Sequence, residues 1–463
     1  MARVVVVGGG IGGLAAGLVL ARRGHRVAVL EREARCAGSE LDADFADWHR
    51  PGVPQAVQPH VLLGPVREVL RGAAPDVLAA MLRLGAQERN ELADFAPDEQ
   101  LPDDEGLVTI RARRIVLESA LVAAVRAEPG VDFRPGTEVT GLLTRPGPVP
   151  VVTGVATAAG ALDADLVVDA GGRRSPVPGW LAAAGARPVL VETQRTGIAY
   201  FCRWYRRRPG NTAPEPTGLG SAAPFANCRV FPADNGHFAV ALTVSVQDPL
   251  RARLREPAVF DRVAAAFPGV TPWLALDHEA VTPVHVMAGI ENRWTSLVDE
   301  HGPQAAGLLA LGDSAVHTNP TLGQGIPLAF LAVEWLAGQD LADQELPAAY
   351  HRWRLARLRP WFDAQVAMDQ AGQEALRSGV AGVPKPRPSG EALLRAATLP
   401  CGREESAVAR VRAQIRHFRR PAAELLADPE VRDRVTAWLR ANPAFQGGPA
   451  GPDRDRFEAL IDS

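Results

Sequence analysis

Three glycines near the start of the chain, Gly8, Gly10 and Gly13, have the spacing G-x-G-x-x-G. In a turn of this kind the first glycine allows a tight bend, the second lets the backbone approach a pyrophosphate, and the third lets a helix pack closely on a strand. Ile11 and Gly12 lie where that helix begins, and its free N–H groups and partial positive charge favour phosphate. The motif therefore predicts binding of a dinucleotide.

The elements needed to position this motif surround it. The β-branched run 4–7 predicts a buried strand, an apolar helix follows to about Arg23, Gly24 ends it, and residues 25–30 predict a second strand. Glu31 then stands where it can accept hydrogen bonds from a ribose diol, and we place its neighbour Arg32 in the same site. The carboxylate would repel a 2′-phosphate, so the complete βαβ unit predicts FAD or NAD rather than NADP.

Two later motifs have the same strand-then-turn form. A strand-like run at 166–168 precedes Asp169 in the string DAGGRRS, and another at 308–311 precedes Gly312 and Asp313. Pro320 and the string Gly323-Gln324-Gly325 then open an apolar helix that runs from about Ile326 to Ala337. Asp169 and Asp313 could each cap the turn after a strand, or could bind a ligand.

In this order and spacing the motifs resemble the flavoprotein monooxygenases of the para-hydroxybenzoate hydroxylase superfamily, over residues 2–338. The resemblance implies that Asp313 binds a ribityl hydroxyl of FAD and that backbone N–H groups at 323–325 meet the flavin. It also implies that the helix from Ile326 directs its positive end at the flavin, and that Asp169 contacts FAD.

A further segment narrows the resemblance. Residues 52–63, GVPQAVQPHVLL, resemble the PQxxHxHxLL segment of bacterial flavin monooxygenases and epoxidases that tailor polyketides, with Gln58 in place of the first histidine. This implies that Gln55 lies in the cofactor site. His60 either borders the flavin ring or is a structural histidine satisfied by the backbone.

Two shorter elements complete the implied cofactor site. The string RRIVLE at 113–118 resembles the family's RxxLE element, whose arginine approaches the ribityl and pyrophosphate groups. Arg114 takes this place by register, with Arg113 as the alternative, and either could instead be a solvated surface residue. Val139, in the short strand 138–140, would meet the adenine through its backbone.

The middle of the chain has a different pattern. Residues 196–205 alternate with a period of two, and the Asn235-Gly236 pair between two apolar runs is a strong hairpin signal. We therefore expect an antiparallel sheet inserted into the FAD fold, which in the resembled family roofs the active site. The candidate substrate contacts, each of which could instead be core, are Tyr200, Trp204, Phe231 and Phe238.

The expected fold is α/β: a Rossmann-type, glutathione reductase-like FAD-binding domain with an inserted antiparallel sheet and a C-terminal helical region. The expected boundaries are 1–187 with 285–340 for FAD, 188–284 for substrate, and 341–463 for the helices. We expect the four arginines at 352, 354, 357 and 359 to form a solvated face, and the last twenty residues to fray.

Composition excludes several classes of protein. The 463 residues carry a net charge of −3, which disfavours nucleic-acid binding, and 47% are hydrophobic, which excludes a disordered chain. The four cysteines form no CxxC pair, so no metal site is expected. The absence of an apolar run long enough to span a bilayer, or of a signal-type segment, predicts a cytoplasmic protein. The sequence leaves the oligomeric state open.

The reaction that we expect is oxygen transfer from a flavin C4a-hydroperoxide, formed from reduced FAD and O₂, to a lipophilic small molecule in bacterial natural-product biosynthesis. NADH or NADPH would supply the electrons, and hydroxylation and epoxidation are not separated. His317, Pro320 and His60 are the candidate catalytic residues.

Other reactions compete with this one. The alternatives are an FAD oxidase or a geranylgeranyl-reductase-like enzyme working by hydride transfer at N5, and a non-catalytic FAD-fold binding protein. A flavin halogenase is disfavoured because the single lysine, Lys385, lies in an expected linker. A two-Rossmann Baeyer–Villiger oxygenase is disfavoured because a second strand-flanked GxGxxG is missing.

Overall fold

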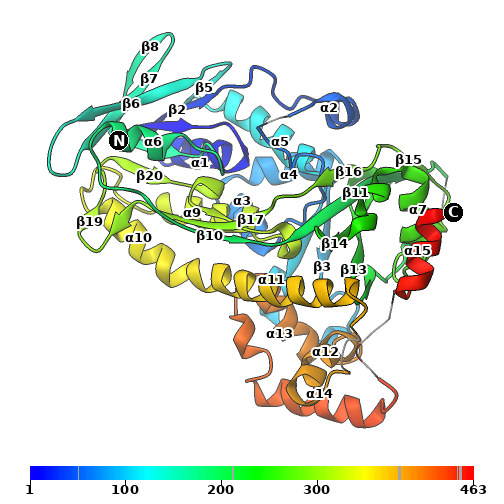
Figure 1. The fold of residues 1–463 in the computed structure, drawn as a ribbon. Helices are drawn as coiled ribbons and strands as arrows, with labels where there is room; N and C mark the ends of the chain where they lie inside the picture. The colour runs from blue at the N-terminus through cyan, green and yellow to red at the C-terminus, as the bar shows by residue number, and fades with distance from the viewer. Residues whose placement is uncertain (51, 211–212, 384–386, 446, 448–450) are drawn as a thin grey trace.

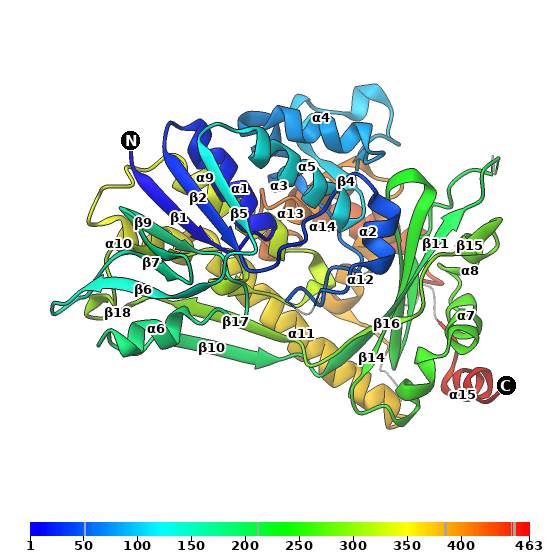
Figure 2. The same cartoon turned by 90° about the horizontal axis from the view of Figure 1, so that it is seen from above.

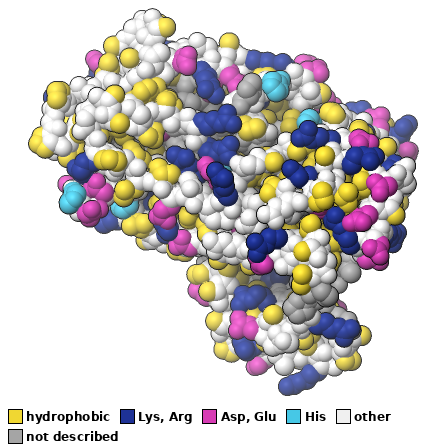
Figure 3. Space-filling model, viewed as in Figure 1, with side chains coloured by type: hydrophobic (Ala, Val, Ile, Leu, Met, Phe, Trp, Pro, Cys, Tyr) yellow, Lys and Arg dark blue, Asp and Glu magenta, His cyan; other side chains and the backbone are white. Residues whose placement is uncertain are grey.

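The computed structural model describes residues 1–50, 52–210, 213–383, 387–445, 447 and 451–463, so Lys385 lies outside the described residues. Figure 1 shows two β-rich parts side by side, a long helix beneath both, and a lobe of helices below it. No helix among the described residues is both long and apolar enough to cross a membrane. Basic and acidic side chains are interspersed on the face shown in Figure 3.

A five-stranded parallel sheet in the order β20-β9-β1-β2-β5 forms the nucleotide-binding part. The valine run of β1 lies at its centre and is buried. The strands are β1 (Arg3–Val7), β2 (Arg26–Glu31), β5 (Val131–Pro135), β9 (Leu166–Asp169) and β20 (Leu308–Ala310). With α1 at Ile11–Arg22 between β1 and β2, the predicted βαβ unit is confirmed.

Helices and a small sheet cover this parallel sheet. One side buries a large apolar cluster under α1, α5 (Arg114–Ala127) and α9 (Gly325–Leu336). The other side packs on the antiparallel sheet β6 (Val139–Arg145), β7 (Val151–Thr157) and β8 (Gly160–Asp163). The remaining elements of this part are α2 (Leu41–Asp47), α3 (Gly64–Ala73), α4 (Pro75–Arg83), β3 (Gln87–Asn90), β4 (Val108–Arg111) and α6 (Val177–Ala183).

The predicted antiparallel sheet is present, in the order β12-β13-β14-β11-β15, with β16 also paired to β11 (Figure 2). Asn235, at φ +50°, lies in the turn between β13 and β14, as the Asn-Gly signal predicted. The strands are β11 (Ile198–Arg207), β12 (Gly220–Ala223), β13 (Ala226–Pro232), β14 (His237–Ser245), β15 (His278–Ala280) and β16 (His285–Met287).

Both faces of this sheet are buried. Phe201 and Tyr205 of β11 pack with α7 (Pro257–Ala265) and α8 (Thr271–Leu274). Cys202 and Trp204 point to the opposite face and join the apolar cluster of the nucleotide-binding part. We call these the outer face and the inner face of the inserted sheet.

A third sheet connects the two parts. β10 (Leu190–Arg195) pairs with β17 (Glu291–Ser296), and β17 pairs with β21 (Val316–His317). A two-stranded ribbon, β18 (Val298–Asp299) and β19 (Gly302–Pro303), follows β17. β10 lies in the expected substrate domain (188–284) and β17 in the expected FAD-binding domain (285–340), so strand pairing crosses the boundary between them. The division of the chain into three domains stays a prediction.

The end of the chain is helical, and two expectations about it are wrong. Arg354 is buried rather than solvated, and donates hydrogen bonds to the carbonyl oxygens of Thr295 (2.8 Å) and Ala315 (2.9 Å). The final helix buries Phe457 and Ile461 against the outer face of the inserted sheet instead of fraying. The helices are α10 (Leu346–Arg357), α11 (Arg359–Val380), α12 (Gly390–Cys401), α13 (Ser406–Arg416), α14 (Pro429–Ala441) and α15 (Arg454–Asp462).

Candidate active site

The glycine-rich turn between β1 and α1 leaves open space in front of the helix. Gly8 has φ +111°, and a Cβ on Gly13 would lie 1.9 Å from the carbonyl oxygen of Gly8, so both positions require glycine for the fold. A Cβ on Gly10 would meet nothing within 4 Å. The N–H groups of the first turn of a helix, here Ile11 to Gly13, have no acceptor within the helix. The space and the donors fit a pyrophosphate.

The acid at the end of β2 is fixed by the backbone. One oxygen of Glu31 accepts from the N–H of Gly9 (2.6 Å) and the other from the N–H of Glu33 (2.9 Å). Each carboxylate oxygen has a second lone pair, so a ribose hydroxyl could still be bound. The Arg32 side chain is exposed. Val139 is buried at the start of β6, near the place where Thr137 donates its N–H to the carbonyl of Glu31 (2.8 Å).

A second helix N-terminus lies beside the first. Gly312 (φ +62°) and Gly323 (φ +68°) take left-handed conformations in the turns that lead from β20 to α9. A Cβ on Gly12 would be 3.6 Å from the Cβ of Ala329, so α1 and α9 are in contact. Because each helix follows a strand of the same parallel sheet, both N-termini lie at its carboxyl edge, where α/β proteins bind ligands.

Polar atoms at the start of α9 lack partners. The side-chain oxygen of Gln324, the residue before the helix, and the hydroxyl of Thr318 are buried without a hydrogen bond among the described residues. Pro320 begins the short turn before Gly323, and Ile326, in the first turn of α9, packs against the main apolar cluster. Buried polar atoms normally have partners, so this loop fits the polar edge of a bound flavin.

Four ionisable side chains of the candidate site influence one another's charge: Asp313, His317, Arg114 and His60. An oxygen of Asp313 lies 3.2 Å from Nδ1 of His317. Burial alone would raise the pKa of Asp313, but the charges of His317, Arg114 and Arg173 hold it below its ordinary value. Asp313 is therefore an anion, suited to accept hydrogen bonds from a ribityl chain.

His60 is neutral at physiological pH. Its Nδ1 lies 2.8 Å from the carbonyl oxygen of Gln58, in a turn where the Gln58 N–H also bonds the carbonyl of Gln55 (3.0 Å). Burial and the charge of Arg114 lower the pKa of His60 to about 4. If Nδ1 donates to that carbonyl, Nε2 is an acceptor. His60 could then accept a proton but not supply one.

The structure separates the two candidate arginines. Arg114 bonds Glu118 (3.0 Å), and its charge acts on both His60 and Asp313. Arg113, the alternative, is instead fully buried against Asp234 at 2.7 Å, and so connects α5 to the inserted sheet.

Sequence reasoning missed one arginine of this site. Arg50 bonds Glu118 at 2.6 Å and lies with Gly9 and Glu31 around one hollow. Its Nε is buried without a hydrogen-bond partner among the described residues, although an oxygen of Glu33 lies 3.9 Å away. Arg50 occupies an irregular segment outside every motif, so no spacing signal indicated it.

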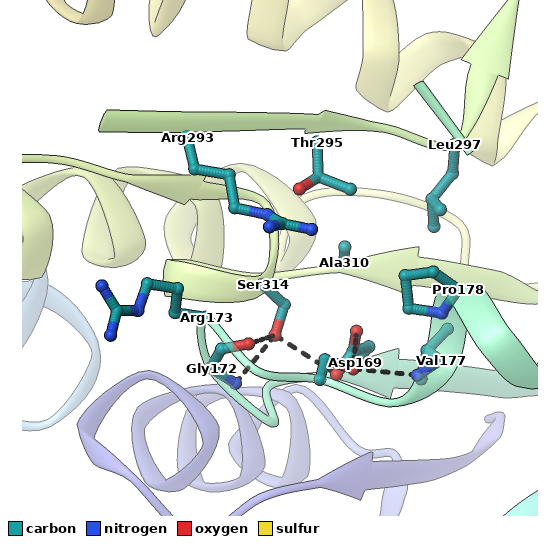
Figure 4. A pocket seen from close by; sticks show the side chains of 11 residues that line it. Asp169, Gly172, Arg173, Val177, Pro178, Arg293, Thr295, Leu297, Ala310 and Ser314 are labelled. Carbon is teal, nitrogen blue, oxygen red and sulfur yellow. Dashed lines mark hydrogen bonds between the residues drawn. The ribbon is translucent and has the colours of Figure 1, made fainter. Parts of the chain in front are cut away.

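Asp169 caps a turn. It is buried and accepts hydrogen bonds from the Ser175 hydroxyl (2.7 Å), the Gly171 N–H (3.0 Å) and the Ser314 hydroxyl (3.2 Å), as Figure 4 shows in part. Burial raises its pKa to about 6. These bonds match the capping alternative, and contact between Asp169 and FAD stays a prediction. Arg173 and Arg293 line the same small pocket.

Three of the four candidate substrate residues lie on the inner face of the inserted sheet. The Tyr200 hydroxyl donates to the side-chain oxygen of Asn319 (2.8 Å) and contacts the Thr321 hydroxyl, in the loop before α9. The indole N–H of Trp204 donates to the carbonyl of Val57 (2.8 Å), and Phe231 packs on the same side.

Phe238 is not brought to this site. It lies on the outer face, with its ring centroid 5.3 Å from that of Tyr205 and 5.4 Å from that of Trp273. Among the described residues, no group of three His, Cys, Asp or Glu side chains is arranged to hold a metal ion.

Comparison with known proteins agrees with this geometry. The family description of NAD(P)-binding Rossmann-like domains matches residues 6–71. Protein Rv3254 of Mycobacterium tuberculosis is 27% identical over 361 residues, which cover 71% of this chain and 70% of that protein.

Solved structures share the fold at low sequence identity. PqsL, a probable FAD-dependent monooxygenase from Pseudomonas aeruginosa, has a TM-score of 0.59 at 18% identity, over 82% of this chain and 99% of that one. OxyS anhydrotetracycline hydroxylase from Streptomyces rimosus has 0.55 at 16%, over 90% and 76%. The myxobacterial FAD-dependent halogenase CndH has 0.56 at 19%, over 90% and 97%. The chain therefore has the fold of FAD-dependent monooxygenases, which FAD-dependent halogenases share.

Proposed function

We propose that this chain is an FAD-dependent monooxygenase, a hydroxylase or an epoxidase, that acts on a lipophilic small molecule. The observation that carries the proposal is the contact between α1 and α9, whose N-termini lie together at the carboxyl edge of one sheet. The first faces open space at Gly10, and at the second the side-chain oxygen of Gln324 has no hydrogen-bond partner in the described part of the chain. One N-terminus suits a pyrophosphate and the other suits a flavin.

In this proposal the residues of the chain hold the cofactor along one path. Glu31 binds the ribose, the N–H groups at the start of α1 bind the pyrophosphate, and Asp313 binds the ribityl chain. Arg114, whose charge reaches Asp313, balances negative charge between these groups. When bound, FAD supplies the redox chemistry and the activation of O₂. NADH or NADPH would supply the electrons.

The chain's own contribution to the reaction is to exclude water and to manage protons. The inner face of the inserted sheet covers the site with Tyr200, Trp204 and Phe231, which suit an apolar molecule. His317, whose Nδ1 lies 3.2 Å from an oxygen of Asp313, is the candidate to hold a proton near the ribityl side. His60 is neutral and could accept one.

A role in bacterial natural-product biosynthesis is part of the proposal. Its support is the polyketide-type segment at 52–63, together with the shared fold of OxyS, a hydroxylase of anhydrotetracycline. The same fold in CndH does not separate oxygenation from halogenation, because that protein is a halogenase.

The test uses the purified full chain. The protein should carry FAD, which extraction and chromatography identify, and NADH or NADPH should reduce it without oxygen. Mixing with oxygenated buffer and candidate lipophilic substrates should give product with one added oxygen atom. A purified protein that binds no flavin would contradict the proposal and would support the alternative of a non-catalytic binding protein with this fold. Rapid reoxidation with stoichiometric peroxide and no oxygenated product from any substrate would show an oxidase.

A further inference from the structure

The end of α13 contacts the backbone of Gly64, which is far from it in the sequence. α13 belongs to the helical lobe of α12, α13 and α14, which lies below α11 in Figure 1 and which we call the C-terminal lobe. His417 follows α13 and is fully buried, and its Nδ1 accepts the backbone N–H of Gly64 at 2.7 Å. A Cβ on Gly64 would lie 2.7 Å from the same Nδ1, so the imidazole packs directly on this backbone.

The N–H group that His417 binds belongs to the N-terminus of α3. Gly64 is the first residue of this helix, and the N–H groups of a first helical turn have no acceptor within the helix. Pro65 has no N–H, and the N–H of Val66 donates to the carbonyl oxygen of Leu63 (2.9 Å). The side chain of Leu63, which precedes the helix, makes no capping bond. His417 therefore supplies the cap of α3 from the other end of the chain.

The segment that leads into α3 borders the candidate cofactor site. His60 lies four residues before Gly64, and its pKa, which burial lowers most, also responds to the charge of Asp313. The carbonyl oxygen of Val61 would be 3.5 Å from a Cβ on Gly323, in the loop before α9. The bond to Gly64 therefore anchors the end of a segment that contacts the candidate flavin loop.

The second ring nitrogen of His417 faces a carboxylate. Its Nε2 lies 3.2 Å from an oxygen of Glu91 without making a hydrogen bond to it. Burial would raise the pKa of Glu91, but the charge of Arg416 and the contact with His417 lower it to about 2, so Glu91 is an anion. Because Nδ1 accepts a bond, the ring proton lies on Nε2, beside this anion. The carboxylate thus favours the tautomer in which Nδ1 can accept from Gly64.

Other contacts fix the position of His417. The next residue, Phe418, has φ +63°, which is uncommon for a residue other than glycine. Its ring centroid lies 4.5 Å from that of Trp361 in α11, and its carbonyl oxygen accepts a bond from Arg357 of α10 (3.0 Å). Within α13, Arg410 pairs with the buried Asp104 at 2.9 Å. The C-terminal lobe therefore presents the imidazole in a defined place.

We propose that His417 is a positioning residue for the FAD site, because by capping α3 at Gly64 it holds the segment from His60 onward against the loop before α9. The C-terminal lobe, which carries none of the recognised motifs, thereby contributes to the affinity for FAD. His417 acts through the backbone of Gly64 and not on the cofactor itself. This inference rests on the proposed function, because it concerns the cofactor that the function requires.

The test compares two substitutions that each keep one side of the imidazole. His417→Asn places an amide oxygen near the position of Nδ1, where it can still accept from Gly64, whereas His417→Gln places its amide near the position of Nε2. Titration of the flavin-free full chain with FAD, followed by fluorescence quenching, gives Kd. His417→Asn should bind FAD within about twofold of the wild type, whereas His417→Gln and His417→Ala should bind roughly 3- to 10-fold more weakly.

Hydrogen–deuterium exchange reports on the proposed cause directly. In the flavin-free chain, the backbone of residues 60–66 should exchange faster in His417→Gln than in His417→Asn. The urea midpoints of these two variants should be similar, because each loses one of the two contacts of the ring. A role in stability alone would not separate the two variants by their affinity for FAD.

Two control variants are available in the chain. Arg410→Gln loosens the C-terminal lobe at a different place, so it should lower the urea midpoint and leave the Kd for FAD unchanged. His25 makes the same kind of bond as His417, since its Nδ1 accepts the backbone N–H of Ala2 (3.2 Å), but it lies at the amino end of the parallel sheet. His25→Ala should therefore bind FAD like the wild type.

The outcomes separate this inference from the proposed function. Equal Kd values for His417→Asn and His417→Gln, whether or not they differ from that of the wild type, would overturn the assignment. An Arg410→Gln chain whose Kd rises as far as that of His417→Gln would also overturn it. If His417→Ala does not fold, the comparison of Asn with Gln still decides. A wild-type chain that binds no FAD would instead contradict the proposed function.

Discussion

Two glycines of the first turn should respond to the same substitution in opposite ways. Gly13→Ala would place a methyl group 1.9 Å from the carbonyl oxygen of Gly8, so α1 must move away from β1. Gly10→Ala would place a methyl group in space with no atom within 4 Å. Gly13→Ala should therefore destabilise the fold, whereas Gly10→Ala should weaken only the binding of a ligand in that space.

The structure sets the size of each effect. Overpacking of a tight contact costs about 1–3 kcal/mol, and the Gly13 contact involves backbone, which yields least. Alanine in place of glycine before the first helical residue costs less than about 1 kcal/mol. A methyl group that pushes a pyrophosphate off one N–H group loses a charge-assisted bond of about 1.5–3 kcal/mol, or about 10- to 100-fold in Kd.

Urea unfolding of the flavin-free proteins measures the first effect, and titration with FAD by fluorescence quenching measures the second. Gly13→Ala should unfold at lower urea, and Gly10→Ala should unfold like the wild type but bind FAD more weakly. If Gly10→Ala binds FAD with wild-type affinity, the pyrophosphate does not lie in front of Gly10, and the assignment of the turn is refuted.

Three further predictions concern carboxylates at or near the candidate site. Asp313→Ala should lower the flavin-to-protein absorbance ratio after gel filtration, because the ribityl chain loses an anionic acceptor; an unchanged ratio would refute that role. Asp369→Ala should lower the free energy of unfolding by at least about 3 kcal/mol, because Asp369 accepts bonds from the side-chain amides of Asn292 (2.7 Å), Asn319 (2.7 Å) and Gln365 (2.9 Å); a urea midpoint equal to that of the wild type would contradict this. Asp169 has a pKa of about 6 when folded, above its unfolded value of 3.8, so the folded chain binds more protons between these pH values. The free energy of unfolding should therefore fall as the pH rises, by about 3 kcal/mol over the whole titration and by about 2 kcal/mol between pH 4 and pH 6. Asp169→Asn should lack this component of the pH dependence in urea titrations, and an unaltered slope would count against it.

Local signals predicted most of the nucleotide-binding part. The valine run, the spaced glycines and Gly24 define β1, α1 and the turn to β2 through short-range sterics, and these carry over directly into the structure. The hairpin at Asn235 was predicted for the same reason, since left-handed backbone there favours Asn and Gly.

Partners distant in the chain were not predictable. Alternation in β13 and β14 indicates two faces but does not show which one meets the candidate cofactor site. The prediction for Phe238 is therefore wrong, because this residue lies on the outer face. Arg354 sits among other arginines in a sequence typical of a solvated helix. Its burial depends on the carbonyl oxygens of Thr295 and Ala315, which no local pattern connects with α10.

The loop before α9 is the clearest case in which contacts between distant segments could not be predicted from the sequence. Residues 341–463 carry none of the recognised motifs, yet α11 packs against β14 of the inserted sheet and β17 of the connecting sheet, and it supplies Asp369 (Figure 2). That carboxylate binds the side chain of Asn319, which precedes Pro320 and bonds Tyr200. The position of the loop before α9, and of one wall of the candidate substrate site, therefore depends on a single carboxylate in the C-terminal helices. Asp369 collects one amide from its own helix and two from distant segments, and sequence spacing does not reveal the distant pair. The motif-free region is therefore part of the framework of the candidate site.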